Sequence, residues 1–260
     1  GLGDVYKRQP PGRSYLSYTV IWYPFFLNSS AHASPAGPAP IIPTLWSLLF
    51  LAKSIILSNV FSANTLYNES MNNIADNILE KLSEFDTATV FNAMVSIKGL
   101  PNFDYMDNSI RCLLPNLGTA IGYAVTVEVT TNDQDSPQVP FSNYYDVLNE
   151  TKGPIFALLK DVDSLPGRGA AFGDNMAALH KRFGVTGVII DGSIRDLSGI
   201  NEVGLPVWSS GIVPGHGRFV PTRVNNPVTI AGLRVRPKEI IMADENGVLR
   251  IPTDDIKLIH

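Results

Sequence analysis

From residue 74 onward, the hydrophobic and polar positions of the chain follow regular spacings. Between residues 74 and 85 an apolar side chain recurs every three or four positions, which predicts a helix with one buried face. Asp86 or Thr87 can cap a second helix, which carries further apolar positions before Gly99. We expect these two helices to cover one side of a sheet.

The middle and end of the chain contain short apolar segments that resemble strands. Alternating apolar positions over residues 123–129 predict a half-buried strand, and the unbroken apolar run at 155–159 predicts a buried one. A short helix is expected at 144–149 and a loop at 163–168. Five more short strands are expected at 206–209, 228–230, 233–235, 240–242 and 248–251. The pattern therefore predicts a single α/β domain with a mixed sheet or barrel and outer helices.

One stretch, residues 173–196, places acidic residues and an arginine around one helix and one strand. Asp174 precedes an apolar-periodic run that closes at Gly184, so it is predicted to be the N-cap of a helix of about three turns. The β-branched run at 185–190 is predicted to be a buried strand that ends at a turn over residues 191–192. Because ligands collect beyond the carboxyl ends of such strands, this stretch is the candidate active site.

The residue types in this stretch suit an acidic substrate and a hard cation. The helix start would offer the backbone N–H groups of Asn175 and Met176 to a carboxylate or phosphate. Arg195 has the planar guanidinium that binds a carboxylate, and Asp196 offers the oxygen ligands that Mg²⁺ or Mn²⁺ prefers. On physical grounds alone, these two residues equally fit a surface ion pair in which Asp196 caps the helix-like segment 197–203. Both interpretations stay open at this point.

Other chemically capable side chains have simpler interpretations. Asp191, which precedes a glycine, is interpreted as a turn former. His216 lies between two glycines and is interpreted as an exposed side chain, although it could reach a ligand from a flexible loop, and Arg218 and Arg223 are similar cases. The single cysteine, Cys112, is expected to be a buried apolar residue.

Composition narrows the class of protein. Hydrophobic residues make up 45% of the 260 positions and charged residues 17%, which is ordinary for a soluble globular fold. The net charge of −4, with lysines and arginines scattered singly, argues against nucleic acid as a main partner. One cysteine excludes an internal disulfide, and the four histidines do not cluster at the spacing of a zinc site.

The first 70 residues do not continue the regular pattern, so we place the candidate domain at residues 71–260. Residues 1–9 resemble the translation of a library adapter and are excluded from the fold interpretation. The rest of this leader lacks a sustained period, as expected of a disordered or mistranslated segment. Its apolar stretch at 41–61 is interrupted by a proline, a lysine and an asparagine, so we expect no membrane partner. We expect a cytoplasmic protein, with secretion as the less favoured alternative.

Several short motifs occur in a fixed order between residues 74 and 252. They comprise residues 84–90, Gly173-Asp174, Gly184, Gly187-Val188, Asp191-Gly192, Arg195-Asp196, residues 204–207, residues 224–228, Gly232, Pro237 and residues 243–248. This ordered set resembles the RraA-like family, which includes the class II, metal-dependent 4-hydroxy-4-methyl-2-oxoglutarate aldolases and oxaloacetate decarboxylases. Each motif alone is weak, whereas their order over so long a span is specific.

The resemblance implies a fold, an assembly and a reaction. The fold would be a swivelling β/β/α-type domain that forms homotrimers or hexamers, with active sites at subunit interfaces. The reaction would release pyruvate from a short 2-oxo acid, by aldol cleavage of 4-hydroxy-4-methyl-2-oxoglutarate or by decarboxylation of oxaloacetate. Mg²⁺ or Mn²⁺ would be the cofactor and would stabilise the enolate as a Lewis acid.

Carried to the matching positions, the resemblance gives each residue of the candidate site a role. Asp196 is expected to hold the metal ion, directly or through water, and Arg195 to bind the pyruvyl oxygens. Asp174 is expected to hold a metal-bound water and to help move the proton that re-forms pyruvate. The implied substrate-binding residues are Gly173, Asp174, Asn175, Met176 and Arg195.

Two departures from the family pattern bear on these expectations. The chain ends at His260, whereas the aldolases carry a further C-terminal helix that brings an acidic residue to the neighbouring subunit's metal site, so we expect a truncated domain. Lys238-Glu239 stands where Gly-Asp is usual, which predicts an altered turn. The alternative interpretation is a non-catalytic regulator of the RraA type, which binds an RNA-degrading endonuclease.

Overall fold

The computed structural model of the chain describes residues 77–253, apart from residues 101 and 134. These residues belong to one compact unit. The predicted leader at 1–70, with its adapter-like start and its apolar stretch, lies outside the described residues, as does the chain end on which the predicted truncation depends. Within the described part, the helices are too short or too polar to cross a membrane.

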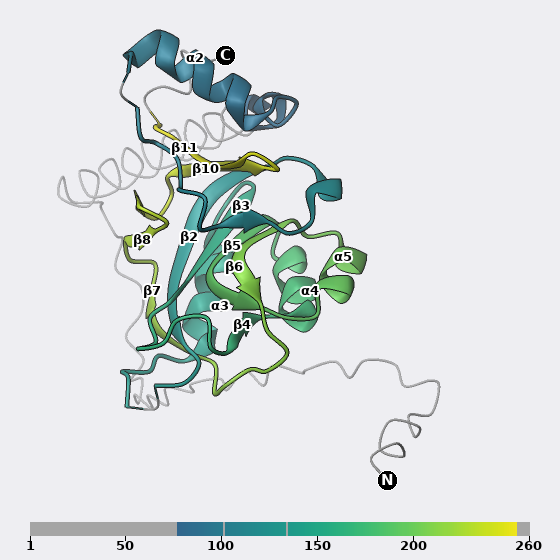
Figure 1. Cartoon of the computed structure of the whole chain (residues 1–260), viewed down its shortest axis with the longest axis vertical. Coiled ribbons are helices and arrows are strands. Elements are labelled where there is room, and N and C mark those ends of the chain that lie inside the picture. Colours follow the sequence, from purple (N-terminus) through teal and green to yellow (C-terminus); the bar gives the residue numbers. More distant parts are fainter. Residues whose placement is uncertain (1–76, 101, 134, 254–260) are drawn as a thin grey trace, which may run out of the picture. The chain divides into compact units, whose positions relative to one another are not determined.

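A mixed sheet forms the centre of the described part of the chain (Figure 1). Its strands are β1 (Arg111–Cys112), β2 (Ala120–Thr130), β3 (Ile155–Asp161), β4 (Ala170–Phe172), β5 (Val185–Ile194), β6 (Val207–Ile212), β7 (Val220–Val224), β10 (Ile240–Asp244) and β11 (Gly247–Ile251). The other elements are the helices α2 (Thr87–Lys98), α3 (Phe141–Glu150), α4 (Asp174–Arg182) and α5 (Leu197–Val203), the 3₁₀ turn Pro115–Leu117, and the hairpin of β8 (Val228–Ile230) and β9 (Leu233–Val235). The predicted α/β class and mixed sheet are confirmed.

The order of the strands explains where a ligand can bind. Strands β6, β5, β3 and β2 lie side by side and run parallel, while β1 and the β10–β11 pair add antiparallel edges. β4 runs parallel to β5, and β7 runs antiparallel to β2. Parallel neighbours need crossover connections, which α3, α4 and α5 supply. The carboxyl ends of β4 and β5 and the N-termini of α4 and α5 therefore meet at one edge of the sheet.

Two layers cover the two faces of this sheet. Helices α3, α4 and α5 pack on one face, where Tyr144 and Ile200 join the apolar side chains of the strands to form the helix-side core. The β8–β9 hairpin packs on the other face with Trp208 and forms the hairpin-side core. Helix α2 covers β10 and β11 through Val90 and Met94 (Figure 1). The chain thus buries both faces of its central parallel strands.

Strand β3 shows how the sequence produces these two layers. Ile155, Ala157 and Leu159 point into the helix-side core, while Phe156 and Leu158 point into the hairpin-side core. All five side chains are fully buried, so the run contains no polar position. Burying one such large apolar side chain contributes roughly 1.5–3 kcal/mol.

Helix α2 follows its prediction closely. The Asp86 carboxylate caps the helix by accepting the Thr89 N–H at 2.6 Å, and the helix ends at the predicted Gly99. Phe85, which was predicted on the buried face of the preceding helix, is instead 51% exposed. That helix ends at residue 82 in the structure, so Phe85 lies beyond the helical repeat.

Strand β6, predicted at residues 206–209, continues to Ile212, and β2 and β5 also differ from their predictions. β2, predicted to be half-buried, is buried on both faces because both cores reach it. β5, predicted to end at residue 190, continues to Ile194 because β4 and β6 pair with Ser193 and Ile194. The turn predicted at residues 191–192 is therefore wrong, since both residues lie inside β5.

Candidate active site

The predicted site residues lie where β4 and β5 end. β4 runs beside the last residues of β5 and leads through Gly173 into the start of α4. The Arg195 N–H donates to the Phe172 carbonyl oxygen at 3.0 Å, which ties the segment after β5 to the end of β4. Two segments that are separated by a helix and a strand in the sequence therefore meet at the edge of the sheet.

One cavity of about 150 Å³ collects all six residues predicted for the site. Its lining residues are Gly173, Asp174, Asn175, Met176, Arg195 and Asp196, with Ala170, Ala171, Phe172, His216 and Phe219. A second hollow of about 370 Å³ is lined by Arg195, Asp196, Ile212, Val213 and Pro214. The structure brings the predicted residues together, and the chemical role of each stays a prediction.

Arg195 and Asp196 form an ion pair in which Nε and Oδ2 are 3.1 Å apart. Their side chains are 37% and 39% exposed, so both also reach solvent. Asp196 has a left-handed backbone, with φ 57° and ψ 39°, which residues other than glycine seldom adopt. It precedes α5 as expected, but its side chain makes no capping hydrogen bond. The carboxylate is thus directed to Arg195 rather than to the helix.

The start of α4 differs by one residue from the prediction. Gly173 occupies the N-cap position and Asp174 is the first helical residue, so the predicted Asp174 cap is wrong. Asp174 Oδ1 instead accepts the Asn175 N–H at 2.7 Å, which means that one of the two N–H groups predicted to face a substrate is already bound. The Met176 N–H has no acceptor among the described residues. It remains a backbone donor at this positive end of the helix.

Two glycines allow the charged side chains to approach the backbone closely. A Cβ at Gly173 would lie 2.9 Å from Asp196 Oδ2 and 3.5 Å from Arg195 Cγ. A Cβ at Gly199 would lie 2.8 Å from Asp174 Oδ2. A larger residue at either position would displace one of the two carboxylates.

Helix α4 is held against α3 by a fully buried histidine. His180 Nδ1 lies 2.7 Å from the Met176 carbonyl oxygen, and Nε2 lies 2.8 Å from the Tyr144 hydroxyl. Because a carbonyl only accepts, Nδ1 carries the proton and Nε2 accepts from Tyr144. Burial lowers the pKa of His180 to about 4, which keeps the ring neutral at physiological pH. This link positions the helix whose first turn lines the cavity.

Residues predicted to lie outside the site are mostly found outside it. Asp191, predicted to be a turn former, lies inside β5, where burial raises its pKa. Its Oδ2 atom is 3.5 Å from the Nζ atom of Lys160 in β3. Cys112 is only partly buried beside the hairpin-side core, and burial raises the pKa of its thiol. Arg218 and Arg223 are exposed and do not line the cavity. His216 is exposed as predicted, and it also lines the cavity, which was the less favoured alternative from the sequence.

The donors in the cavity fit a divalent cation that keeps most of its water ligands. Asp174 and Asp196 contribute two carboxylates. In the part of the chain that the structure describes, no three His, Cys, Asp or Glu side chains come together as a metal cage. Mg²⁺ commonly uses one or two protein carboxylates, whereas a structural Zn²⁺ takes four protein ligands. The donor set therefore suits Mg²⁺ or Mn²⁺ better than Zn²⁺.

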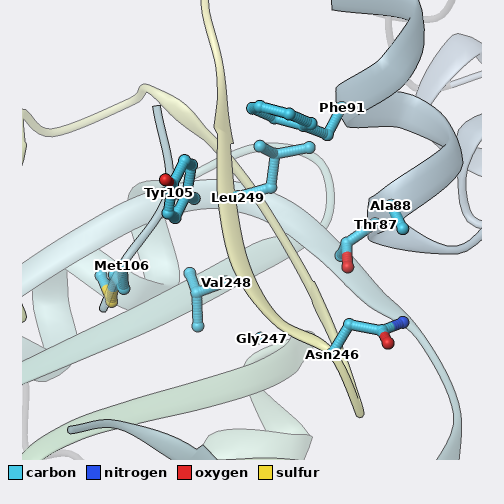
Figure 2. Close-up of a pocket in the computed structure, with 9 residues that line it drawn as sticks. All are labelled: Thr87, Ala88, Phe91, Tyr105, Met106, Asn246, Gly247, Val248 and Leu249. Carbon is cyan, nitrogen blue, oxygen red and sulfur yellow. The ribbon is translucent and has the colours of Figure 1, made fainter. Parts of the chain in front are cut away.

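A separate cavity of about 230 Å³ lies beside α2 and β11. Figure 2 shows Phe91, Tyr105 and Leu249 gathered toward one end, with Thr87 and Asn246 toward the other. None of its described lining residues is a lysine, arginine, histidine, aspartate or glutamate. An acidic substrate would find no counter-charge there, so the cavity at Arg195 is the better candidate active site.

Sequence comparisons relate the chain to known proteins. A family model described as RraA-like, Aldolase/RraA, matches residues 87–250. An uncharacterized protein of Methanocaldococcus jannaschii is 28% identical over 154 residues, which cover 57% of this chain and 68% of that protein. A 4-hydroxy-4-methyl-2-oxoglutarate aldolase of Thermus thermophilus is 31% identical over 86 residues, which cover 33% of this chain and 52% of the aldolase. The match thus spans about half the length of that enzyme.

A solved structure shares the fold. RraAS2 of Streptomyces coelicolor, described as an unusual member of the RNase ES inhibitor RraA protein family, has a TM-score of 0.57 and 24% identity, and the match covers 70% of this chain and 89% of that one. Likeness at this level of identity shows the fold alone. The family model covers more than half of the chain and includes every residue of the candidate cavity. The chain therefore belongs to the RraA-like family.

Proposed function

We propose that this protein is a lyase that releases pyruvate from a short 2-oxo acid with the help of a divalent cation. Its reaction would be aldol cleavage of 4-hydroxy-4-methyl-2-oxoglutarate, decarboxylation of oxaloacetate, or both. The observation that carries the proposal is the single cavity that joins the Arg195 guanidinium to the carboxylates of Asp174 and Asp196. The name of the Thermus relative and the description of the family support the same chemistry.

Both reactions break the C3–C4 bond of the substrate and leave negative charge on the C2 oxygen. Mg²⁺ or Mn²⁺, held by Asp196 and through water by Asp174, would supply Lewis-acid stabilisation of that charge. Arg195 binds the carboxylate and 2-oxo oxygens through its planar guanidinium and adds positive charge where the enolate forms. The Met176 N–H donates to the substrate carboxylate at the positive end of α4. Asp174 helps a water deliver the proton that converts the enolate to pyruvate.

The first test is pyruvate release from oxaloacetate by the full chain, with Mg²⁺ or Mn²⁺ and with a chelator. The decarboxylation that the metal causes by itself is subtracted. We expect metal-dependent release that falls at least about 100-fold in Arg195→Ala and in Asp196→Asn. Arg223→Ala and Asp146→Asn are matched controls, because both side chains are exposed outside the cavity, and both variants should keep the wild-type rate.

The controls separate damage to the fold from damage to the site. Equal losses in the control variants would mean that the rates report folding rather than catalysis. Sedimentation of the same samples measures whether the expected homotrimer or hexamer forms. No release above the metal background from folded wild-type protein would refute the lyase proposal. A protein-binding regulator would then be the remaining interpretation.

A further inference from the structure

His216 adds to the cavity a basic side chain for which the proposed chemistry has no role so far. It lies in the loop between β6 and β7, with Gly215 before it and Gly217 after it. The Gly215 carbonyl accepts the Ala170 N–H at 2.8 Å, and a Cβ at Gly217 would clash with the Thr131 carbonyl group. The backbone on both sides of His216 is therefore anchored to the ends of neighbouring strands, which differs from the flexible loop that was predicted.

The hydrogen bonding of His216 leaves one ring nitrogen unused. Nδ1 lies 2.9 Å from the Gly217 carbonyl oxygen, and because a carbonyl only accepts, Nδ1 carries the proton of the neutral ring. Nε2 then holds a lone pair, and nothing in the described part of the chain bonds to it. One oxygen of each carboxylate in the cavity is engaged, since Asp196 Oδ2 pairs with Arg195 and Asp174 Oδ1 accepts the Asn175 N–H. Nε2 of His216 is thus an unpartnered nitrogen base at this cavity.

The two reactions of the proposed function differ in their need for a base. Loss of carbon dioxide from oxaloacetate removes no proton before the C3–C4 bond breaks. Cleavage of a 4-hydroxy-2-oxo acid does remove one, because the 4-hydroxyl group must become a carbonyl. Near neutral pH an imidazole suits this proton transfer, whereas an ordinary carboxylate is a weaker base.

On the basis of the proposed lyase function, we infer that His216 is the general base for aldol cleavage and so extends the site from oxaloacetate to 4-hydroxy-2-oxo acids. Nε2 takes the proton of the 4-hydroxyl, and the electron pair of that O–H bond forms the new C4=O bond. The C3–C4 pair becomes the C2–C3 double bond of the enolate, with the charge on the C2 oxygen. The enolate takes a proton from water at C3 to give pyruvate, and the imidazolium returns its proton to solvent.

The test compares both reactions in the full chain carrying His216→Gln or His216→Ala. Glutamine keeps a polar side chain of similar size but cannot act as a base at neutral pH. We expect kcat for aldol cleavage to fall about 100-fold or more, with oxaloacetate decarboxylation within about threefold of wild type. Arg218→Ala, in the same loop but outside the cavity, is the matched control and should keep both rates. Added imidazole should partly restore aldol cleavage in His216→Ala, which a purely structural role would not produce.

The outcomes distinguish this inference from the function on which it rests. Unchanged aldol cleavage in His216→Gln, or an equal loss of both reactions, would overturn the inference and leave the lyase proposal standing. A wild-type protein that decarboxylates oxaloacetate but cleaves no 4-hydroxy-2-oxo acid would also overturn the inference and leave the lyase proposal standing. Absence of both reactions in the wild-type protein would refute the proposed function and the inference with it.

Discussion

At the scale of single residues, Gly173 packs closely against the ion pair of the site because it has no side chain. A Cβ at Gly173 would come 2.9 Å from Asp196 Oδ2, so an alanine there must displace the Arg195–Asp196 pair. The Gly173 backbone is extended, which alanine adopts readily. For Gly173→Ala we predict a fall of about 10- to 100-fold in pyruvate release, with a change of less than about 1 kcal/mol in the free energy of unfolding.

The matched control for this substitution is Gly211→Ala. A Cβ at Gly211 would meet no atom within 4 Å, so this variant should keep both activity and stability. Steady-state rates and urea unfolding of the two variants measure the two effects separately. If Gly173→Ala lowered the free energy of unfolding enough to account for its loss of activity, close packing against Asp196 would not be the reason why glycine is needed at position 173.

The sequence predicts some of these residue contacts and cannot predict others. Arg195 and Asp196 are adjacent in the chain, and their side chains point to one ligand type, so their joint role can be proposed from the sequence. The position of His216 at the cavity cannot be predicted in this way, because it depends on Gly217 packing against Thr131, which follows β2 and is distant in the sequence. A single histidine between two glycines has no periodic pattern that would reveal such a contact.

At the scale of elements, α4 depends on a buried polar link to α3. Tyr144→Phe removes the hydroxyl that donates to His180 Nε2 and leaves that nitrogen buried without a donor. We predict a loss of about 1–3 kcal/mol in the free energy of unfolding, measured by urea denaturation. Tyr145→Phe is the matched control, because this half-buried hydroxyl has no hydrogen bond among the described residues and its removal should cost under about 0.5 kcal/mol. Similar losses in both variants would contradict the proposed link.

Elements with an internal pattern are the ones that the sequence predicts well. The bounds of β8 and β9 match their predictions, and α2 has its predicted cap. The end of β5 does not match, because Asp191-Gly192 has the composition of a turn and only pairing with β4 and β6 keeps the chain extended there. β4 is buried at all three positions and shows no alternation, whereas β8 and β9, which are equally short, alternate between buried and exposed residues. Tertiary pairing, rather than local preference, determines these segments.

At the scale of the whole molecule, two buried groups make stability respond to pH in opposite directions. Burial lowers the pKa of His180 to about 4 from an ordinary 6.5, so its contribution is present above pH 6.5 and is lost as the pH falls toward 4. Burial raises the pKa of Asp161 to about 6 from an ordinary 3.8, although the N–H groups of Asp163 and Gly167 donate to it. The contribution of Asp161 is fully present below pH 3.8 and is lost as the pH rises through 6.

Between about pH 6.5 and about pH 5, each contribution should change by roughly 1–2 kcal/mol, and the two should nearly cancel in the wild-type protein. Removing one group should reveal the pH dependence that the other group gives to stability. Asp161→Asn should therefore lose stability as the pH falls through this window, whereas His180→Gln should gain stability. Burial of Asp163 is outweighed by hydrogen bonds from Thr130 and Thr131, which lower its pKa and place its titration below the window. Urea unfolding at several pH values gives the slope for each protein. Parallel slopes in the wild type and both variants would mean that other groups control the acid response.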